Sequence, residues 1–163
     1  MLPQGLNVTP LTANAFAPYG DLIELEGKPD KIINQGMCGR YHDLAKLDFT
    51  DGRAGISFFD AKERRLPIVV DMVERHAMGS QAFIPLSGVR FLAIVADDDD
   101  GRPVNLSAFV VGGEQSINLH CGIWHGVLTP IGASGRFVVV DRIGDGTNLE
   151  EHWFETPYVI ERL

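Results

Sequence analysis

Closely spaced strand-like segments constrain the fold of this chain more than any other feature of its sequence. Seven segments are rich in β-branched and aromatic residues, namely 55–59, 66–75, 82–86, 89–96, 108–111, 126–129 and 137–140. Turn-forming Gly, Pro, Asp and Ser separate almost all of them, and no long helical pattern lies between them. This arrangement favours antiparallel sheets closed into a barrel or sandwich over βαβ units. We therefore predict an all-β chain with minor helix, built as an antiparallel barrel or jelly roll.

Local signals predict two short elements between the strands. Thr12 is a good N-cap for a helical turn at 13–16, and Pro18 and Gly20 would end that turn. The run 97–101, Asp-Asp-Asp-Asp-Gly, lacks the alternating ligands of a calcium loop. It is expected to form a solvated hairpin turn instead.

Two further segments leave alternatives open. Tyr41, His42 and Asp43 would form either an acid–base relay or a turn, and we favour the turn, with Asp43 beginning a helical turn through Leu47. Residues 148–163 are expected to pack either as a terminal strand or as an arm exchanged with a partner.

Composition and charge narrow the class of protein. With 163 residues, of which 45% are hydrophobic and 22% charged, the chain can bury one core without disulfides, so we predict a single domain spanning 1–163. The formal charge of −8 repels phosphate backbones and anionic membrane surfaces, which argues against nucleic acid or a membrane as partner. Cys38 and Cys121 form no CxxC pattern and no signal peptide is visible, so we expect a reduced, cytoplasmic protein.

One polar cluster is predicted at the end of the segment 66–75. Glu74 and His76 are two residues apart, so both side chains point to the same face of a strand. A turn at 78–80 would return Gln81 beside them. The spacing of these three residues, followed by Gly88, resembles the first motif of the cupin barrels, in which such residues bind a metal. The predicted barrel is therefore of the cupin type.

A second cluster lies in the stretch 120–125, His-Cys-Gly-Ile-Trp-His. Its Gly-x-x-His end resembles the second cupin motif, which makes His125 the last candidate metal ligand beside Glu74, His76 and Gln81. Oxygen and nitrogen ligands of this kind suit nickel, manganese or zinc and do not choose among them. A hydrogen-bonded polar network without metal is the alternative interpretation of the same residues.

Four segments together resemble one enzyme family, the ureidoglycolate lyases. They are 40–45, 74–86, 117–125 and 137–144, which follow one another in order and cover much of the chain. The sequence departs from the family pattern at Cys121, where arginine is common, and at Gly126, where a second histidine often follows. The resemblance implies a cupin-fold homodimer that splits (S)-ureidoglycolate into glyoxylate and urea in allantoin and purine nitrogen catabolism. Such an enzyme is a carbon–nitrogen lyase of the amidine-lyase type.

The implied reaction can be matched to residues. Cleavage of ureidoglycolate requires a base for its hydroxyl proton and an acid for the departing urea nitrogen, and it needs no organic cofactor. His76 and His125 are the candidates for these roles, with Glu74 orienting them or sharing the proton. The candidate substrate-binding residues are Ser80, Gln81, His120, Arg40 and Arg142.

Two other functions remain open at this point. One is a metal-dependent cupin enzyme that acts on a different small acid, because two histidines and a glutamate also match the ligand set of iron oxygenases. The other is a cupin that binds a small metabolite without catalysis.

Overall fold

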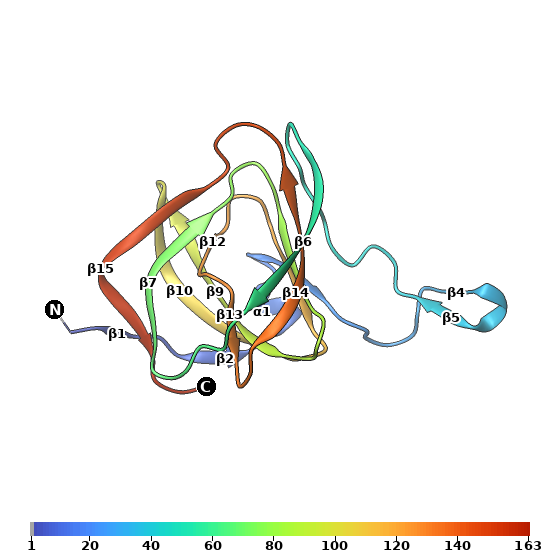
Figure 1. Cartoon of the computed structure of the whole chain (residues 1–163), viewed down its shortest axis with the longest axis horizontal. Coiled ribbons are helices and arrows are strands. Elements are labelled where there is room, and N and C mark those ends of the chain that lie inside the picture. Colours follow the sequence, from blue (N-terminus) through green and yellow to red (C-terminus); the bar gives the residue numbers. More distant parts are fainter. Residues whose placement is uncertain (1) are drawn as a thin grey trace.

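Two largely antiparallel sheets form the molecule, as seen in a computed structural model that describes residues 2–163 (Figure 1). The larger sheet has the order β1 (Gln4–Gly5), β15 (Glu150–Ile160), β7 (Ile68–Arg75), β12 (Trp124–His125), β9 (Arg90–Asp99), β10 (Arg102–Val111) and β2 (Val8–Pro10), with β13 (Thr129–Ile131) also paired to β9. The smaller sheet has the order β3 (Gly20–Ile23), β11 (Ser116–Leu119), β8 (Gln81–Pro85), β14 (Gly135–Ile143) and β6 (Arg53–Ala61). The prediction of an all-β chain with minor helix and largely antiparallel sheets is confirmed.

The main core lies between the two sheets. On β14, Phe137 and Val139 are fully buried, whereas their neighbours Val138 and Val140 are only half-buried, which is the alternation of a strand with one face on the core. Phe137 meets Phe91 of the larger sheet edge to face, with ring centroids 5.2 Å apart. Apolar burial of this kind supplies most of the stability of the barrel.

The N-terminal segment makes the larger sheet curl on itself. Strand β1 pairs in parallel with β15, and β2, only a few residues later, pairs in parallel with β10 at the other edge (Figure 1). Leu6, between these two strands, packs in a second buried cluster with side chains such as Ile68, Leu92 and Ile160. The N-terminal segment therefore pairs with both edges of the larger sheet, and β7 and β12 lie between those edges.

A long arm leaves the barrel between β3 and β6. We call residues 24–47 the arm; it carries β4 (Lys31–Ile33) and β5 (Cys38–Arg40), joined by the short 3₁₀ helix η1 (Asn34–Gly36), and Figure 1 shows it extending away from both sheets. The predicted helical turn from Asp43 to Leu47 is wrong. Asp43 has a positive φ of 52°, and the backbone N–H of Lys46 donates to Asp21 of β3 instead of to the arm itself.

The other local predictions mostly hold. The short helix α1 (Ala13–Phe16) begins at Thr12, whose hydroxyl accepts from the Ala15 N–H. The hairpin turn lies between β9 and β10, with positive φ at Asp100 and Gly101, and residues 150–160 form the terminal strand β15. The strand predicted at 126–129 is wrong for 126–128, which are irregular, and only Thr129 begins β13. Among residues 2–163 no helix is long and apolar enough to span a membrane.

Candidate functional site

The candidate site lies where β7, β8, β11 and β12 come together at one end of the barrel. Glu74 of β7 stands directly opposite His125 of β12 in the antiparallel register, so both side chains project from the same face of the larger sheet. Residues that follow β7 return to form the start of β8, which places Gln81 opposite Leu119 of β11 in the smaller sheet. His76, Gln81 and His125 line one small pocket between the sheets.

Glu74, His76 and His125 form a compact group of potential metal ligands. One ligand atom from each residue lies within 4.8 Å of the others. His76 Nε2 is 3.9 Å from Glu74 Oε1, and the two imidazole rings are tilted with centroids 5.3 Å apart. The three side chains therefore come together in the structure, as the two motifs predicted.

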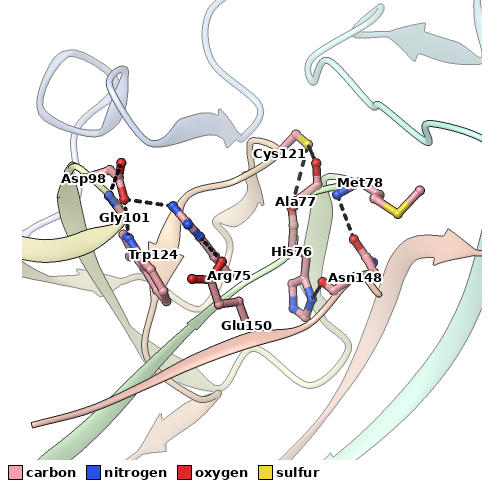
Figure 2. Close-up of polar contacts among 10 residues, drawn as sticks. All are labelled: Arg75, His76, Ala77, Met78, Asp98, Gly101, Cys121, Trp124, Asn148 and Glu150. Carbon is pink, nitrogen blue, oxygen red and sulfur yellow. Dashed lines mark hydrogen bonds and ion pairs between the residues drawn. The ribbon is translucent and has the colours of Figure 1, made fainter. Parts of the chain in front are cut away.

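Hydrogen bonds at Nδ1 orient both imidazoles. His76 Nδ1 is 3.1 Å from the carbonyl oxygen of Asn148, and His125 Nδ1 is 3.0 Å from that of Gly126 (His76 and Asn148 are drawn in Figure 2). A carbonyl can only accept, so each Nδ1 carries a proton, and Nε2 has a free lone pair whenever the ring is neutral. Both Nε2 atoms are buried and have no hydrogen-bond partner among residues 2–163.

Asn148 connects the site to the segment before β15. Its side-chain Oδ1 accepts from the Met78 N–H at 2.8 Å, while its main-chain carbonyl contacts His76 (Figure 2). One residue thus holds both the His76 ring and the turn that leads back to Gln81. These contacts of Asn148 could not be predicted from a local pattern, because the residue lies about seventy residues from its partners and outside both motifs.

Burial sets the charge state of the group. Desolvation lowers the pKa of His125 to about 4, with a further lowering by the nearby charge of His76. Desolvation also raises the pKa of Glu74, and the charge of His76 opposes that rise. His125 is therefore a neutral imidazole at pH 7, the form that binds metals and accepts protons.

Gln81 and His120 complete the polar lining of the pocket. Gln81 Nε2 donates to Asp141 Oδ2 at 3.2 Å, while its Oε1 is buried without a partner in the described chain. His120 Nε2 lies 3.0 Å from Asp21 Oδ2. Neither Asp21 nor Asp141 was assigned a role from the sequence, although Asp141 lies in the segment 137–144, because both reach the site only through strand pairing.

Ser80 and Arg142 lie near the site but are occupied by the backbone. Ser80 Oγ accepts from the Asp48 N–H at 2.9 Å and contacts the Asp48 carbonyl at 3.4 Å. The buried Arg142 donates to the carbonyl oxygens of Thr50, Asp51 and Asp145. Both side chains therefore fix the loops around the pocket. Arg40 lies on β5 in the exposed arm, outside the pocket of its own chain.

Arg75 points away from the site, because it lies between Glu74 and His76 and alternate side chains of a strand face opposite ways. Its guanidinium pairs with Glu150 at 2.7 Å and Asp98 at 2.8 Å, and lies 4.3 Å from the ring centroid of Trp124 (Figure 2). Trp124 is 1% exposed and donates to Asp98, so it packs beside the site rather than lining it. This network ties β7, β9, β12 and β15 together next to His76 and His125.

A donor set of one carboxylate and two imidazoles with free Nε2 atoms fits a divalent metal. Oxygen and nitrogen ligands with a hydrogen-bonded outer shell are what such ions require. The fold and site thus define a β-barrel protein with a group of three side chains that could hold a metal ion. The chain belongs to the ureidoglycolate lyase family, whose model matches residues 3–161, and it is a lyase by that membership.

Curated relatives support this assignment over nearly the whole chain. The ureidoglycolate lyase of Rhodobacter capsulatus is 59% identical over 157 residues, which is 96% of this chain and 98% of the relative. Ureidoglycolate lyase 2 of Rhizobium meliloti is 45% identical over 163 residues, 99% of each chain. Among solved structures, a 3,4-ketoisomerase from Helicobacter canadensis aligns with a TM-score of 0.43 and 13% identity, over 79% of this chain and 87% of that one.

Proposed function

We propose that this protein is a carbon–nitrogen lyase of the amidine-lyase type that cleaves (S)-ureidoglycolate into glyoxylate and urea. Membership of the ureidoglycolate lyase family and relatives of that name support the substrate. The observation that carries the proposal is the compact group of half-buried Glu74 and His76 with buried His125, in which the Nε2 atoms of both histidines lie unpartnered in one pocket.

The reaction needs two proton transfers. The hydroxyl of the substrate loses a proton, the electrons form the carbonyl of glyoxylate, the carbon–nitrogen bond breaks, and the urea nitrogen gains a proton. A neutral His125 accepts a proton at pH 7, and His76, beside Glu74, is positioned to return one. The raised pKa of Glu74 suits a carboxyl that shares this proton rather than one that only carries charge.

When a divalent ion is bound, Glu74, His76 and His125 would hold it, with Gln81 Oε1 as a further oxygen donor; the two Nε2 atoms then bind the ion, and the proton transfers assigned to them above belong to the metal-free site. We propose nickel, manganese or zinc, which accept this mixture of oxygen and nitrogen ligands. Such an ion acts as a Lewis acid on substrate oxygen atoms. The hydrogen bonds from Nδ1 to the carbonyls of Asn148 and Gly126 keep both imidazoles in the orientation that ligation requires.

The remaining polar side chains have two proposed roles: some contact the substrate, and others hold the backbone around the pocket. Gln81 and His120 line the pocket, so we assign them to the hydroxyl or ureido group of the substrate. Ser80 and Arg142 hydrogen-bond to the surrounding backbone, so we assign them to the shape of the pocket mouth. Two unpaired cysteines and the acidic surface agree with a cytoplasmic enzyme that uses neither nucleic acid nor a membrane.

The deciding experiment follows glyoxylate and urea separately from racemic ureidoglycolate, using protein of defined metal content. The proposed function predicts equal amounts of the two products and consumption of half of the racemate. Turnover without urea would identify a different reaction of the same substrate. No turnover with nickel, manganese or zinc would refute the proposed function and favour an enzyme for another small acid, or a metabolite-binding protein.

A further inference from the structure

The pocket of a single chain has no cation for the carboxylate of an anionic substrate. None of the residues that line the pocket with His76 and His125 is a lysine or an arginine. Arg75 and Arg142 are occupied by acidic side chains and by carbonyl oxygens respectively, and Arg64 lines a different cavity, which it shares with Glu74. A small carboxylate in this acidic protein therefore needs a positive group from elsewhere.

The arm presents two such groups side by side. Lys31 of β4 stands directly opposite Arg40 of β5, and both residues are exposed. Like charges opposite each other destabilise a strand pair, and neither side chain forms an ion pair within residues 2–163. The pair thus has the arrangement of an anion-binding site without its anion.

The arm is also incomplete as an isolated structure. A two-stranded hairpin is marginally stable on its own in water, yet β4 and β5 pair only with each other. The arm exposes five large apolar side chains, with Met37 86% and Leu25 76% exposed, and Ile32, Leu44 and Leu47 less so. Residues 24–47 match the roughly 20–30 residues that one side of a standard protein interface uses.

Both roots of the arm lie at the rim of the site. At one root Asp21 contacts His120 and the Lys46 N–H. At the other root the backbone N–H of Ser80 donates to the Asp48 carbonyl, immediately before Gln81 of the pocket. A twofold axis pairs equivalent surfaces of two copies, so an arm that docks at this rim would be matched by the arm of the other copy at the equivalent rim.

Charge favours that docking. The tip of the arm, residues 27–42, carries Lys28, Lys31 and Arg40 against the single acidic Asp30, in a chain whose formal charge is −8. The rim that it would approach carries Asp21 and Asp48, with Glu74 and Asp141 inside. Opposite charges on tip and rim steer two copies into this register.

We propose that the protein is active as a twofold dimer in which the arm of each copy completes the site of the other, with Arg40 binding the substrate carboxylate of the partner. The exposed sheet face beside the arm, with Ile56 76% and Phe58 73% exposed on β6, continues the same interface. Only the identity of the carboxylate rests on the proposed function. The exchange of arms rests on the geometry of one chain.

Complementation between two damaged chains tests the exchange. Arg40→Ala removes the arm contact, and His125→Asn removes a proton-transfer group of the pocket. Heterodimers are isolated with two different affinity tags after co-expression. In a heterodimer one site has both defects, and the other combines an intact His125 with an intact partner Arg40. We expect Arg40→Ala to lower kcat/KM about ten- to hundredfold, mainly through KM, and the heterodimer to recover about half of the wild-type activity per dimer.

The controls separate the inference from the proposed function. Lys62→Ala removes an exposed positive charge between β6 and β7, outside the arm, and should leave activity unchanged. Three outcomes would overturn the exchange of arms while leaving lyase activity established. They are an inactive heterodimer, full activity of Arg40→Ala, and a wild-type protein that is monomeric in analytical ultracentrifugation. If the wild type does not turn over ureidoglycolate, the exchange of arms is tested instead by backbone amide hydrogen exchange at residues 31–33 and 38–40. Protection that disappears on dilution to monomer supports the exchanged arm, and fast exchange in the dimer refutes it.

Discussion

Replacing His125 by Asn or Gln separates its structural role from its chemical role. The ring is 4% exposed, its Nδ1 contacts the Gly126 carbonyl at 3.0 Å, and its Nε2 has no partner in residues 2–163. The Asn side-chain amide can reproduce the donor at Nδ1 but has no atom at Nε2. The Gln side chain can instead place an oxygen near the position of Nε2 without a titratable proton.

The expected magnitudes follow from these contacts. One neutral hydrogen bond contributes about 1 kcal/mol, so His125→Asn should lower Tm by no more than a few degrees in a protein of this size. Loss of an acid–base group should lower kcat about 10²–10⁴-fold, which corresponds to roughly 3–5 kcal/mol of transition-state stabilisation. His125→Gln should retain more bound metal than His125→Asn but remain equally slow.

The assay is steady-state release of glyoxylate and urea at pH 7, with bound metal measured on the same preparations and thermal unfolding as the folding control. A folded His125→Asn protein with kcat within tenfold of the wild type would refute the assignment of proton transfer to His125. If His125→Gln regains activity in proportion to its bound metal, the imidazole acts only as a ligand.

Three further perturbations have defined outcomes. In metal-free protein, burial lowers the pKa of His125 from about 6.5 in the unfolded chain to about 4 in the folded chain. The free energy of unfolding should therefore be highest above pH 6.5 and fall by up to about 3 kcal/mol as the pH drops to 4. Chemical denaturation should show this pH dependence in the wild type and not in His125→Asn. Arg142→Met leaves the carbonyls of Thr50, Asp51 and Asp145 without their buried donor. Urea denaturation should then show an unfolding free energy lower by about 3 kcal/mol or more. A loss under about 1 kcal/mol would show that the loops keep their structure without Arg142. Glu74→Gln should weaken metal retention about 10–100-fold in competition with a chelator, and unchanged retention would remove Glu74 from the ligand set.

Local patterns in the sequence were sufficient for much of the fold. Segments rich in β-branched and aromatic residues predicted the principal strands, because such side chains pack well on a pleated sheet, and turn residues marked their ends. In a strand, alternate side chains face opposite sides. The same rule put Glu74 and His76 on one face and Arg75 on the other, and the structure has this arrangement. The Asp-Gly turn after β9 was predictable because positive φ at both residues suits a tight hairpin.

Other features depended on contacts that no local pattern encodes. The arm was not predicted, because β4 and β5 are short and its apolar residues have neither a helical nor a strand period strong enough to stand out. The helical turn expected after Asp43 failed because Asp21, far earlier in the chain, binds the Lys46 N–H and holds the segment extended. A contact in the tertiary structure thus overrode the local preference.

The sequence by itself determined which residues are candidates for the chemistry, because two short motifs contain Glu74, His76, Gln81 and His125 at fixed spacings. Only the tertiary structure decided how those residues behave. Burial by strands from both sheets makes His125 neutral at pH 7, and a carbonyl about seventy residues away orients His76. Desolvation and long-range hydrogen bonds depend on the packing of the whole chain, so a sequence motif can name a ligand but cannot set its charge or direction.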